Sequence, residues 1–214
     1  MKQILIYSDS LSWGLIPDTR QRLSFDKRWP GVFEQSLLSN YNVRVIENCL
    51  NGRRTAWDDP FKESRNASLD LAQAIEINSP LSVVILMLGT NDFQCVHDNN
   101  AWLSAQGTGK LINIIKQAPI EPGMPAPEIL VIAPPAITLP KGVIANKFKH
   151  AEKRGAHLAK ELELISKQYA VHFYDSNSII SASIIDGIHI DEAQHTILGK
   201  TIAHIVFDIY ASKQ

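Results

Sequence analysis

The sequence has few cysteines and no long hydrophobic run. Its 214 residues include only two cysteines, Cys49 and Cys95; they could pair, but two reduced thiols in a cytosolic protein are the simpler interpretation. No apolar segment approaches the roughly 20 residues that a membrane-spanning helix requires. Only Lys2 precedes the first short apolar run, and no small-residue cleavage site follows it. We therefore expect no signal peptide and a cytoplasmic location.

Neither sign of charge is in excess. Lysine and arginine number 21 against 22 aspartates and glutamates, which leaves a formal net charge of −1. This balance gives no electrostatic reason to expect a nucleic acid or an acidic membrane surface as a partner, so a small neutral substrate fits better. The basic run at residues 147–154 lies in a predicted helix and indicates a solvated helix face.

Several motifs of cofactor and metal chemistry are missing. No Gly-x-Gly-x-x-Gly or Walker-type loop follows a predicted strand, and Asp9 after the first strand would repel a phosphate. Asp58 and Asp59 have no histidine at ligand spacing, so we expect no metal site. The strained Gly-x-Ser-x-Gly elbow of the α/β-hydrolases is also absent. These absences disfavour nucleotide binding, metal-dependent hydrolysis and the α/β-hydrolase fold.

What the sequence contains is an alternation of short β-branched runs and longer segments with helical spacing. This pattern is typical of βαβ units, and the length fits one domain over residues 1–214. We expect parallel strands at 3–7, 43–48, 82–88, 128–133 and 171–174. The expected helices are 29–39, 67–78, 101–116, 145–169 and 191–211, the last capped at or just before Asp191. The predicted fold class is therefore α/β with a five-stranded parallel sheet.

A serine and an Asp/His pair are the candidate catalytic residues. Ser10 follows directly on the first strand, and ligands bind at the carboxyl ends of the strands in open α/β sheets. Alone, a serine at this position is more often a helix cap than a nucleophile. Asp186 and His189 lie three positions apart near the C-terminus, a spacing that lets the carboxylate brace the imidazole. Together the three residues predict a nucleophile, a base and an orienting acid.

Two further strand ends supply candidate donors for an oxyanion. The second strand leads to Asn51-Gly52 and the third to Gly89-Thr90-Asn91-Asp92. Gly52 has no Cβ, so its amide can approach a ligand closely, and the neutral carboxamide of Asn91 offers two hydrogens. With the Ser10 amide they would form a three-donor hole for a tetrahedral intermediate. We interpret Asp92 as structural.

At these residues the chain resembles the SGNH hydrolases, also called the GDSL family of esterases and lipases. Four ordered blocks carry the resemblance: Ser8-Asp9-Ser10-Leu11, Gly52, Gly89-Thr90-Asn91-Asp92 and Asp186-Gly187-Ile188-His189. Asp9-Ser10-Leu11-Ser12-Trp13-Gly14, Arg28-Trp29-Pro30-Gly31-Val32 and Asp58-Asp59-Pro60 are most similar to the short arylesterase and acyltransferase branch. Two positions depart from the family: Ser8 replaces the usual glycine, and Asn51-Gly52 replaces a frequent Ser-Ala.

The resemblance implies a three-layer α/β/α flavodoxin-like fold without metal or cofactor. It also implies a Ser10, Asp186, His189 triad and an oxyanion hole of Ser10, Gly52 and Asn91. The predicted activity is hydrolysis of short-chain aryl or alkyl esters through an acyl-enzyme, with possible acyl transfer to alcohols. A carbohydrate O-acetylesterase or a thioesterase of the same family is the alternative. A catalytically silent flavodoxin-like binding module is the alternative from another class.

The substrate pocket and the assembly are less determined. Trp13, Phe93 and Ile188 lie next to predicted catalytic residues and either wall the pocket or belong to the core. Arg53 follows Gly52 and is a candidate substrate contact. By analogy with the branch, a homo-oligomer is expected to use residues 53–68 as a contact surface.

Overall fold

A computed structural model describes residues 1–212. One parallel sheet has the strand order β2-β1-β3-β4-β5. The strands are β1 (Lys2–Ser8), β2 (Val43–Cys49), β3 (Val83–Met87), β4 (Glu128–Ala133) and β5 (His172–Asp175). The strand order reverses between β1 and β3, and in such sheets the crevice at that switch point is where ligands bind. The predicted five-stranded parallel sheet is confirmed.

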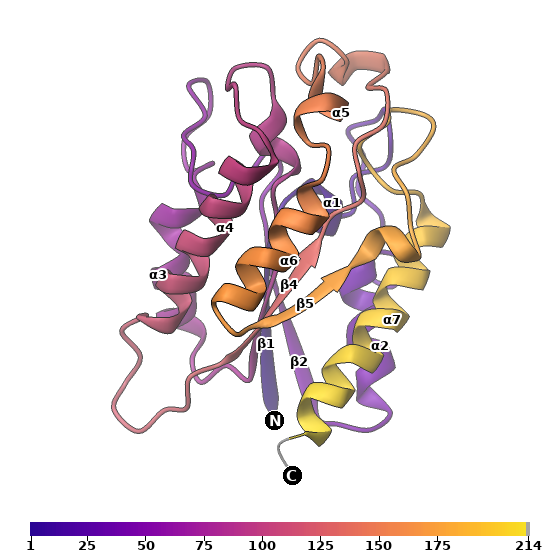
Figure 1. Cartoon of the computed structure of the whole chain (residues 1–214). Coiled ribbons are helices and arrows are strands. Elements are labelled where there is room, and N and C mark those ends of the chain that lie inside the picture. The colour runs from indigo at the N-terminus through magenta and orange to yellow at the C-terminus, as the bar shows by residue number, and fades with distance from the viewer. Residues whose placement is uncertain (213–214) are drawn as a thin grey trace.

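Helices cover both faces of the sheet (Figure 1). One face carries α3 (Ala67–Asn78), α4 (Ala101–Lys116) and α6 (Leu158–Gln168). The other face carries α2 (Trp29–Leu38) and α7 (Glu192–Ala211). The shorter helical segments are α1 (Ser10–Trp13), η1 (Thr90–Phe93), η2 (Gly142–Ile144), α5 (Ala151–Arg154) and η3 (Ser176–Ser178). The predicted three-layer α/β/α arrangement is therefore confirmed.

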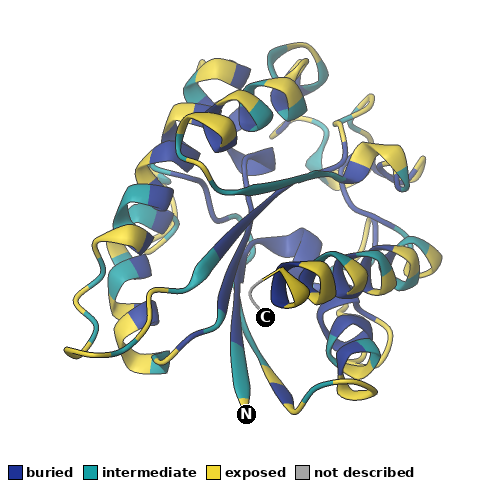
Figure 2. Ribbon diagram, turned by 60° about the horizontal axis from the view of Figure 1, so that its bottom comes forward, coloured by how far each residue is buried: buried dark blue, intermediate teal, exposed yellow. Residues whose placement is uncertain are grey.

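Strand β1 divides its side chains between the two layers. Leu5 and Tyr7 pack in the cluster under α3 and α4, whereas Ile4 and Ile6 pack in the cluster under α2 and α7. All four are fully buried, as the dark strands at the centre of Figure 2 show. Burial on both faces explains why β1 is a continuous apolar run. The strand is thus fixed from both sides, and so is the residue at which it ends.

The expected long helix at 145–169 is wrong. Residues 145–150 are not helical, and α5 and α6 are separate because Gly155 and His157 interrupt the segment. A Cβ at Gly155 would lie 3.0 Å from the ring of Phe93, and His157 has a φ of 70° in the left-handed region. The left-handed backbone at His157 thus ends a helical pattern that the local sequence supports, and the Phe93 ring leaves little room for a side chain at Gly155.

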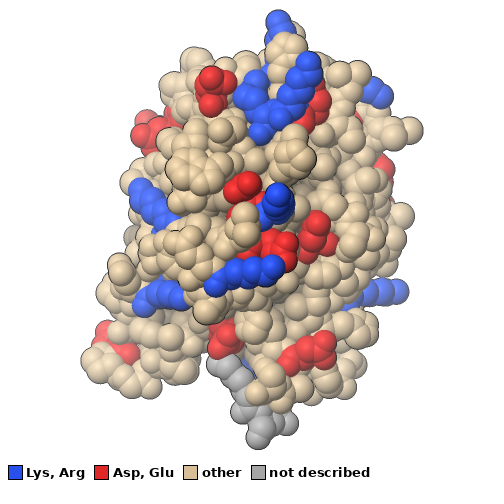
Figure 3. Space-filling view, viewed as in Figure 1, with Lys and Arg blue, Asp and Glu red and all other residues tan. Residues whose placement is uncertain are grey.

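Two smaller expectations have different outcomes. Asp191 does precede α7, but its carboxylate accepts from Ser183 Oγ at 2.9 Å and makes no capping bond. The proline-rich stretches at 118–127 and 134–140 lie on either side of β4, and the sequence indicates that they are connections within one domain and not linkers between two. On the face shown in Figure 3, acidic and basic side chains lie interspersed. Within residues 1–212, no helix is both long and apolar enough to span a bilayer.

Candidate active site

Ser10, His189 and Asp186 come together at the carboxyl edge of the sheet. Ser10 Oγ lies 3.1 Å from His189 Nε2, and His189 Nδ1 lies 2.7 Å from Asp186 Oδ2. Ser10 is 7% exposed and His189 is 6% exposed, although the two are 179 positions apart in the chain. The hydroxyl, imidazole and carboxylate therefore form one continuous hydrogen-bonded chain. This geometry lets the imidazole accept a proton from the serine.

Asp9 leaves the Ser10 hydroxyl free. Strand β1 ends at Ser8, and Asp9 is the N-cap of α1, accepting from Leu11 N at 2.9 Å. The cap role that a lone serine could have is therefore taken by its neighbour. Gly14 ends this short helix with a φ of 84°, a conformation that favours glycine. As a result Ser10 Oγ faces His189 and not the backbone.

Asp186 is held as an acceptor. Besides the His189 ring, it accepts from the backbone amides of Ile188 and His189, both at 2.9 Å, and of Asp18 at 3.2 Å. Burial opposes ionisation of Asp186. The hydrogen bond from the His189 ring, the charge of that ring and the bonds from the Ile188 and His189 amides outweigh it and lower the pKa of Asp186 to about 2. The carboxylate is thus ionised at neutral pH and fixes which ring nitrogen of His189 carries the proton.

Three N–H groups near Ser10 have no protein acceptor in the described part of the chain. The amides of Ser10 and Gly52 donate to no residue among 1–212. Asn91 donates one Nδ2 hydrogen to Asp9 Oδ2 at 2.9 Å, which leaves the second without a partner in the same range. Gly52 has a φ of 84°, and a Cβ there would meet only Arg65 Nε at an ordinary contact distance of 3.9 Å, so backbone conformation, not crowding, favours glycine.

The hydroxyl of Ser8, which stands where the family usually has glycine, is part of a buried chain of hydrogen bonds. Trp29 Nε1 donates to Ser12 Oγ at 3.0 Å, Ser12 Oγ donates to Ser8 Oγ at 2.6 Å, and Ser8 Oγ donates to Met87 O at 2.6 Å. The additional hydroxyl is therefore paired and links β1 to β3 beneath Ser10. The departure from the family's glycine has a local structural role in this chain.

The predicted pocket residues are in different environments. Trp13 is partly exposed at the end of α1, with the Arg22 guanidinium 4.8 Å from its ring. Phe93 and Ile188 are both 1% exposed in the core cluster under α4 and α6, so packing explains them without a substrate. Phe93 also lines a cavity of about 280 Å³ that is bordered by Thr90 and by the loop after β4.

Arg53 does not reach the substrate side of the site, contrary to expectation. It is 4% exposed, and its guanidinium lies 3.9 Å from the Tyr7 ring. One nitrogen donates to Ser8 O at 3.0 Å and another to Asn48 Oδ1 at 2.8 Å. The arginine therefore ties the ends of β1 and β2 together underneath the site.

Asp92 has the structural contacts that the sequence suggested. Its carboxylate accepts from Thr55 N, Thr55 Oγ1 and Ser104 Oγ at 2.6 to 2.9 Å. Burial raises the pKa of Asp92 to about 6 in spite of these bonds.

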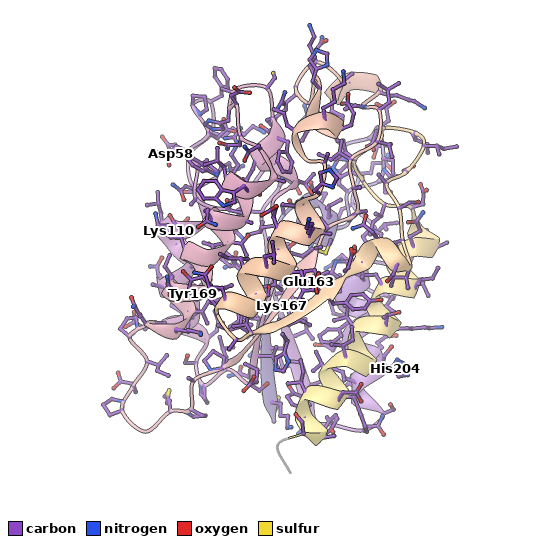
Figure 4. The ribbon with its side chains drawn as sticks, viewed as in Figure 1. Asp58, Lys110, Glu163, Lys167, Tyr169 and His204 are labelled. Carbon is purple, nitrogen blue, oxygen red and sulfur yellow. The ribbon has the colours of Figure 1, made fainter. Side chains whose placement is uncertain are left out.

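His204, which is labelled in Figure 4, is exposed on α7, where its Nδ1 lies 2.8 Å from Lys200 O. In residues 1–212, no group of His, Cys, Asp and Glu side chains is arranged to hold a metal ion.

Comparisons with known proteins place this geometry in a family. The family model described as GDSL-like lipase/acylhydrolase matches residues 9–197. No match was found among curated protein sequences. The structure is similar to that of the native aryl esterase of M. smegmatis, with a TM-score of 0.91, 32% identity and coverage of 97% of this chain and 99% of that one.

Two further solved structures extend the comparison. A carbohydrate acetylesterase from Sinorhizobium meliloti gives a TM-score of 0.91 at 30% identity, with coverage of 98% of this chain and 100% of that one. A lipase/acylhydrolase from Enterococcus faecalis, at 14% identity and a TM-score of 0.65 over 96% and 95% of the two chains, shares the fold. The chain is therefore a carboxylic ester hydrolase that belongs to the GDSL-like lipase/acylhydrolase family.

Proposed function

We propose that the protein is a serine esterase that hydrolyses short-chain acyl esters through Ser10, His189 and Asp186. The observation that carries the proposal is the hydrogen-bond chain from Ser10 Oγ through the His189 ring to Asp186. A hydroxyl is a weak nucleophile until a neighbouring base takes its proton, and an imidazole held by a carboxylate is that base.

The first step forms an acyl-enzyme. Ser10 Oγ attacks the ester carbonyl carbon while its proton passes to His189 Nε2, and the carbonyl π electrons move to the oxygen. The Ser10 and Gly52 amides and the free Asn91 hydrogen stabilise that oxyanion. The oxyanion then collapses, the bond to the leaving alkoxide breaks, and His189 returns the proton to the departing alcohol. Asp186 stays ionised throughout and stabilises the imidazolium.

The second step decides between hydrolysis and transfer. Water that gives its proton to His189 attacks the acyl-enzyme, and collapse of the second oxyanion releases the acid and restores Ser10. An alcohol in the place of water gives a new ester by the same route. The two activities use the same residues, so they differ in which acceptor reaches the acyl-enzyme first.

Two substrate classes are supported by the similar structures. The likeness to the aryl esterase supports short aryl esters, and the likeness to the Sinorhizobium meliloti enzyme supports acetylated carbohydrate as the second candidate. Both are small neutral esters, which agrees with the balanced charge of the chain.

The test compares hydrolysis of p-nitrophenyl acetate, butyrate and octanoate by the wild type and by Ser10→Ala. We expect the wild type to prefer the acetate and Ser10→Ala to lose turnover, because only the oxyanion donors and binding remain. Ser176→Ala, which replaces a buried serine after β5, is the matched control and should keep wild-type turnover. An acetylated xylan oligomer and an added primary alcohol separate acetylesterase and transferase activity. Unchanged turnover in Ser10→Ala would overturn the proposal.

A further inference from the structure

A row of buried polar side chains runs behind the proposed oxyanion hole. It starts at Asp59, continues through Arg54, Gln94 and Asn91, and ends at Asp9. Arg54 and Asp9 have no exposed surface, Gln94 is 1% exposed and Asn91 is 4% exposed. Polar groups buried to this extent cost stability unless each is hydrogen-bonded. Sequence reasoning did not single out Gln94 and considered Arg54 only with Arg53, as a residue beside the expected oxyanion hole, so the place of both behind Asn91 calls for an explanation.

The hydrogen bonds in this row all point the same way. The Arg54 guanidinium can only donate, and it donates to Gln94 Oε1 at 2.5 Å. Gln94 Nε2 then donates to Asn91 Oδ1 at 2.7 Å, and Asn91 Nδ2 donates to Asp9 Oδ2 at 2.9 Å. Rotating the Gln94 amide would set its NH₂ against the guanidinium, and rotating the Asn91 amide would set its oxygen against the Asp9 carboxylate. The positive charge of Arg54 and the negative charge of Asp9 therefore fix the orientation of the Gln94 and Asn91 amides.

Arg54 also holds the Asn91 backbone. Its Nε donates to Asn91 O at 3.2 Å, and its Nη1 lies 3.1 Å from Asp59 Oδ2 and 3.1 Å from Asp58 O. Arg54 lies two positions after Gly52 in the same loop. One side chain thus joins the loop that presents the Gly52 amide to the loop that presents the Asn91 carboxamide.

We propose that Arg54 and Gln94 are positioning residues for the oxyanion hole, which fix the Asn91 carboxamide with one hydrogen on Asp9 and the other toward the reacting carbonyl. The inference rests on the proposed serine mechanism and deepens it. A hole donor stabilises the transition state only if it is already aimed at the developing charge, so its supporting bonds affect turnover more than ground-state binding. A purely structural role for the same buried bonds would lower stability without this signature.

The test is a double-mutant cycle on p-nitrophenyl acetate between Gln94→Glu and Asn91→Ala. Gln94→Glu keeps an acceptor for Arg54 but presents an oxygen, not an NH₂, to Asn91 Oδ1. We expect kcat to fall roughly tenfold, with KM within about twofold of the wild type. This fall is smaller than the loss of kcat expected when an oxyanion donor is removed, because Gln94→Glu only misaligns the donor. In the Asn91→Ala background the same change should have no further effect on kcat, because the group it positions is gone.

Two variants keep the result interpretable. Ser104→Ala removes a buried hydrogen bond to Asp92, the neighbour of Asn91, and should lower the unfolding temperature with kcat within about twofold of the wild type. If Gln94→Glu fails to fold, Arg54→Lys tests the same link: it keeps the charge but loses the planar fork, and should give the same kcat fall and the same dependence on Asn91.

The outcomes separate this inference from the proposed function. Loss of turnover in Ser10→Ala together with an unchanged kcat in Gln94→Glu overturns the positioning role alone. An equal fall in kcat for Gln94→Glu with and without Asn91 also overturns it, because the effect would then not pass through the carboxamide. Retained turnover in Ser10→Ala overturns both proposals.

Discussion

Two Asp-Ser pairs occupy equivalent local positions at the ends of two parallel strands. Asp9-Ser10 follows β1, and Asp175, the last residue of β5, is followed by Ser176. In both pairs the aspartate accepts from the amide two residues on and caps a short helical segment. The two serine hydroxyls differ in partner. Ser10 Oγ faces His189 Nε2, whereas Ser176 Oγ donates to Ala133 O at 2.6 Å.

The position in the sheet explains this difference. Strand β1 lies between β2 and β3 at the switch point, whereas β5 is an edge strand that pairs with β4 alone. The loops that bring Asn91 and His189 therefore meet at the end of β1. Near β5, both Asn177 Nδ2 hydrogens are taken by Pro134 O and Asp175 Oδ1. The comparison teaches that neighbouring loops, not the local Asp-Ser motif, decide whether a serine hydroxyl meets an imidazole.

The largest expected effect on kcat comes from changing Asp186, the carboxylate that holds the His189 ring near Ser10. Asp186→Asn keeps the size of the side chain but no longer favours the ring tautomer that accepts from Ser10, so kcat should fall roughly 10⁴-fold. Asp175→Asn changes the acid of the second pair, the counterpart of Asp9, whose hydrogen bonds go to Asn177 and not to Ser10 or His189, and should leave kcat within about threefold of the wild type. Steady-state kinetics on p-nitrophenyl acetate measure both. Similar losses in the two variants would contradict the assignment.

The next largest effect separates the two asparagines. Asn91→Ala removes a proposed oxyanion donor and should lower kcat about 10²- to 10³-fold with a much smaller change in KM. Asn177→Ala removes an amide whose hydrogens are both taken, by Pro134 O and Asp175 Oδ1, so its effect should fall on thermal stability and not on kcat. A KM effect in Asn91→Ala that accounts for the whole loss would show that the residue binds substrate and does not stabilise the transition state.

A smaller effect concerns the free energy of unfolding, compared for one serine next to each Asp-Ser pair. Ser8→Ala leaves the Ser12 hydroxyl without an acceptor and Met87 O without its donor, which should reduce the free energy of unfolding by about 1–3 kcal/mol. Ser178→Ala removes an exposed hydroxyl near the second pair and should change it by less than about 0.5 kcal/mol. Urea unfolding measures both, and equal effects would show that the Ser8 chain adds nothing to stability.

The smallest expected effect is a slope of stability against pH. Burial raises the pKa of Asp9 and of Asp92 to about 6 from a usual value near 4. Between these values the native state holds protons that the unfolded chain releases, so the free energy of unfolding falls as pH rises through this window. Asp186 acts oppositely: its contribution is present above its usual pKa and is lost as pH falls toward about 2.

The Asp9→Asn variant isolates one part of this slope. Asparagine cannot titrate, so the fall in stability between about pH 4 and pH 6 should be shallower than in the wild type, and Asp92→Asn should act in the same direction. Urea midpoints at several pH values give the difference in slope between variant and wild type. A slope that is unchanged in both variants would contradict the raised pKa values.

Much of the fold follows from the sequence because its signals are local. The alternation of apolar strands and periodic helices predicts the parallel sheet, and Ser10, Asp186 and His189 stand out because strand ends and short spacing bring chemistry together. The break at residues 155–157 is missed because no local signal predicts the left-handed backbone of His157, and the Phe93 ring that crowds Gly155 lies far away in the chain.

The supporting residues are harder to predict than the reacting ones. Arg54 and Gln94 are 40 positions apart and meet only when the loops after β2 and β3 fold together, so no spacing in the sequence indicates their bond. Arg53, the adjacent arginine, is the one that sequence reasoning favours, but its guanidinium packs on the Tyr7 ring and bonds to the ends of β1 and β2. Which of two neighbouring arginines points into a site depends on tertiary packing.

The most direct test of the central claim is covalent labelling with a p-nitrophenyl alkylphosphonate followed by peptide mass mapping. Such a reagent phosphonylates the serine that a neighbouring imidazole activates and releases p-nitrophenol. We predict one adduct on Ser10 in the wild type and in Ser176→Ala, and none in Ser10→Ala or His189→Ala. An adduct on Ser176, or equal labelling of the wild type and His189→Ala, would contradict the account.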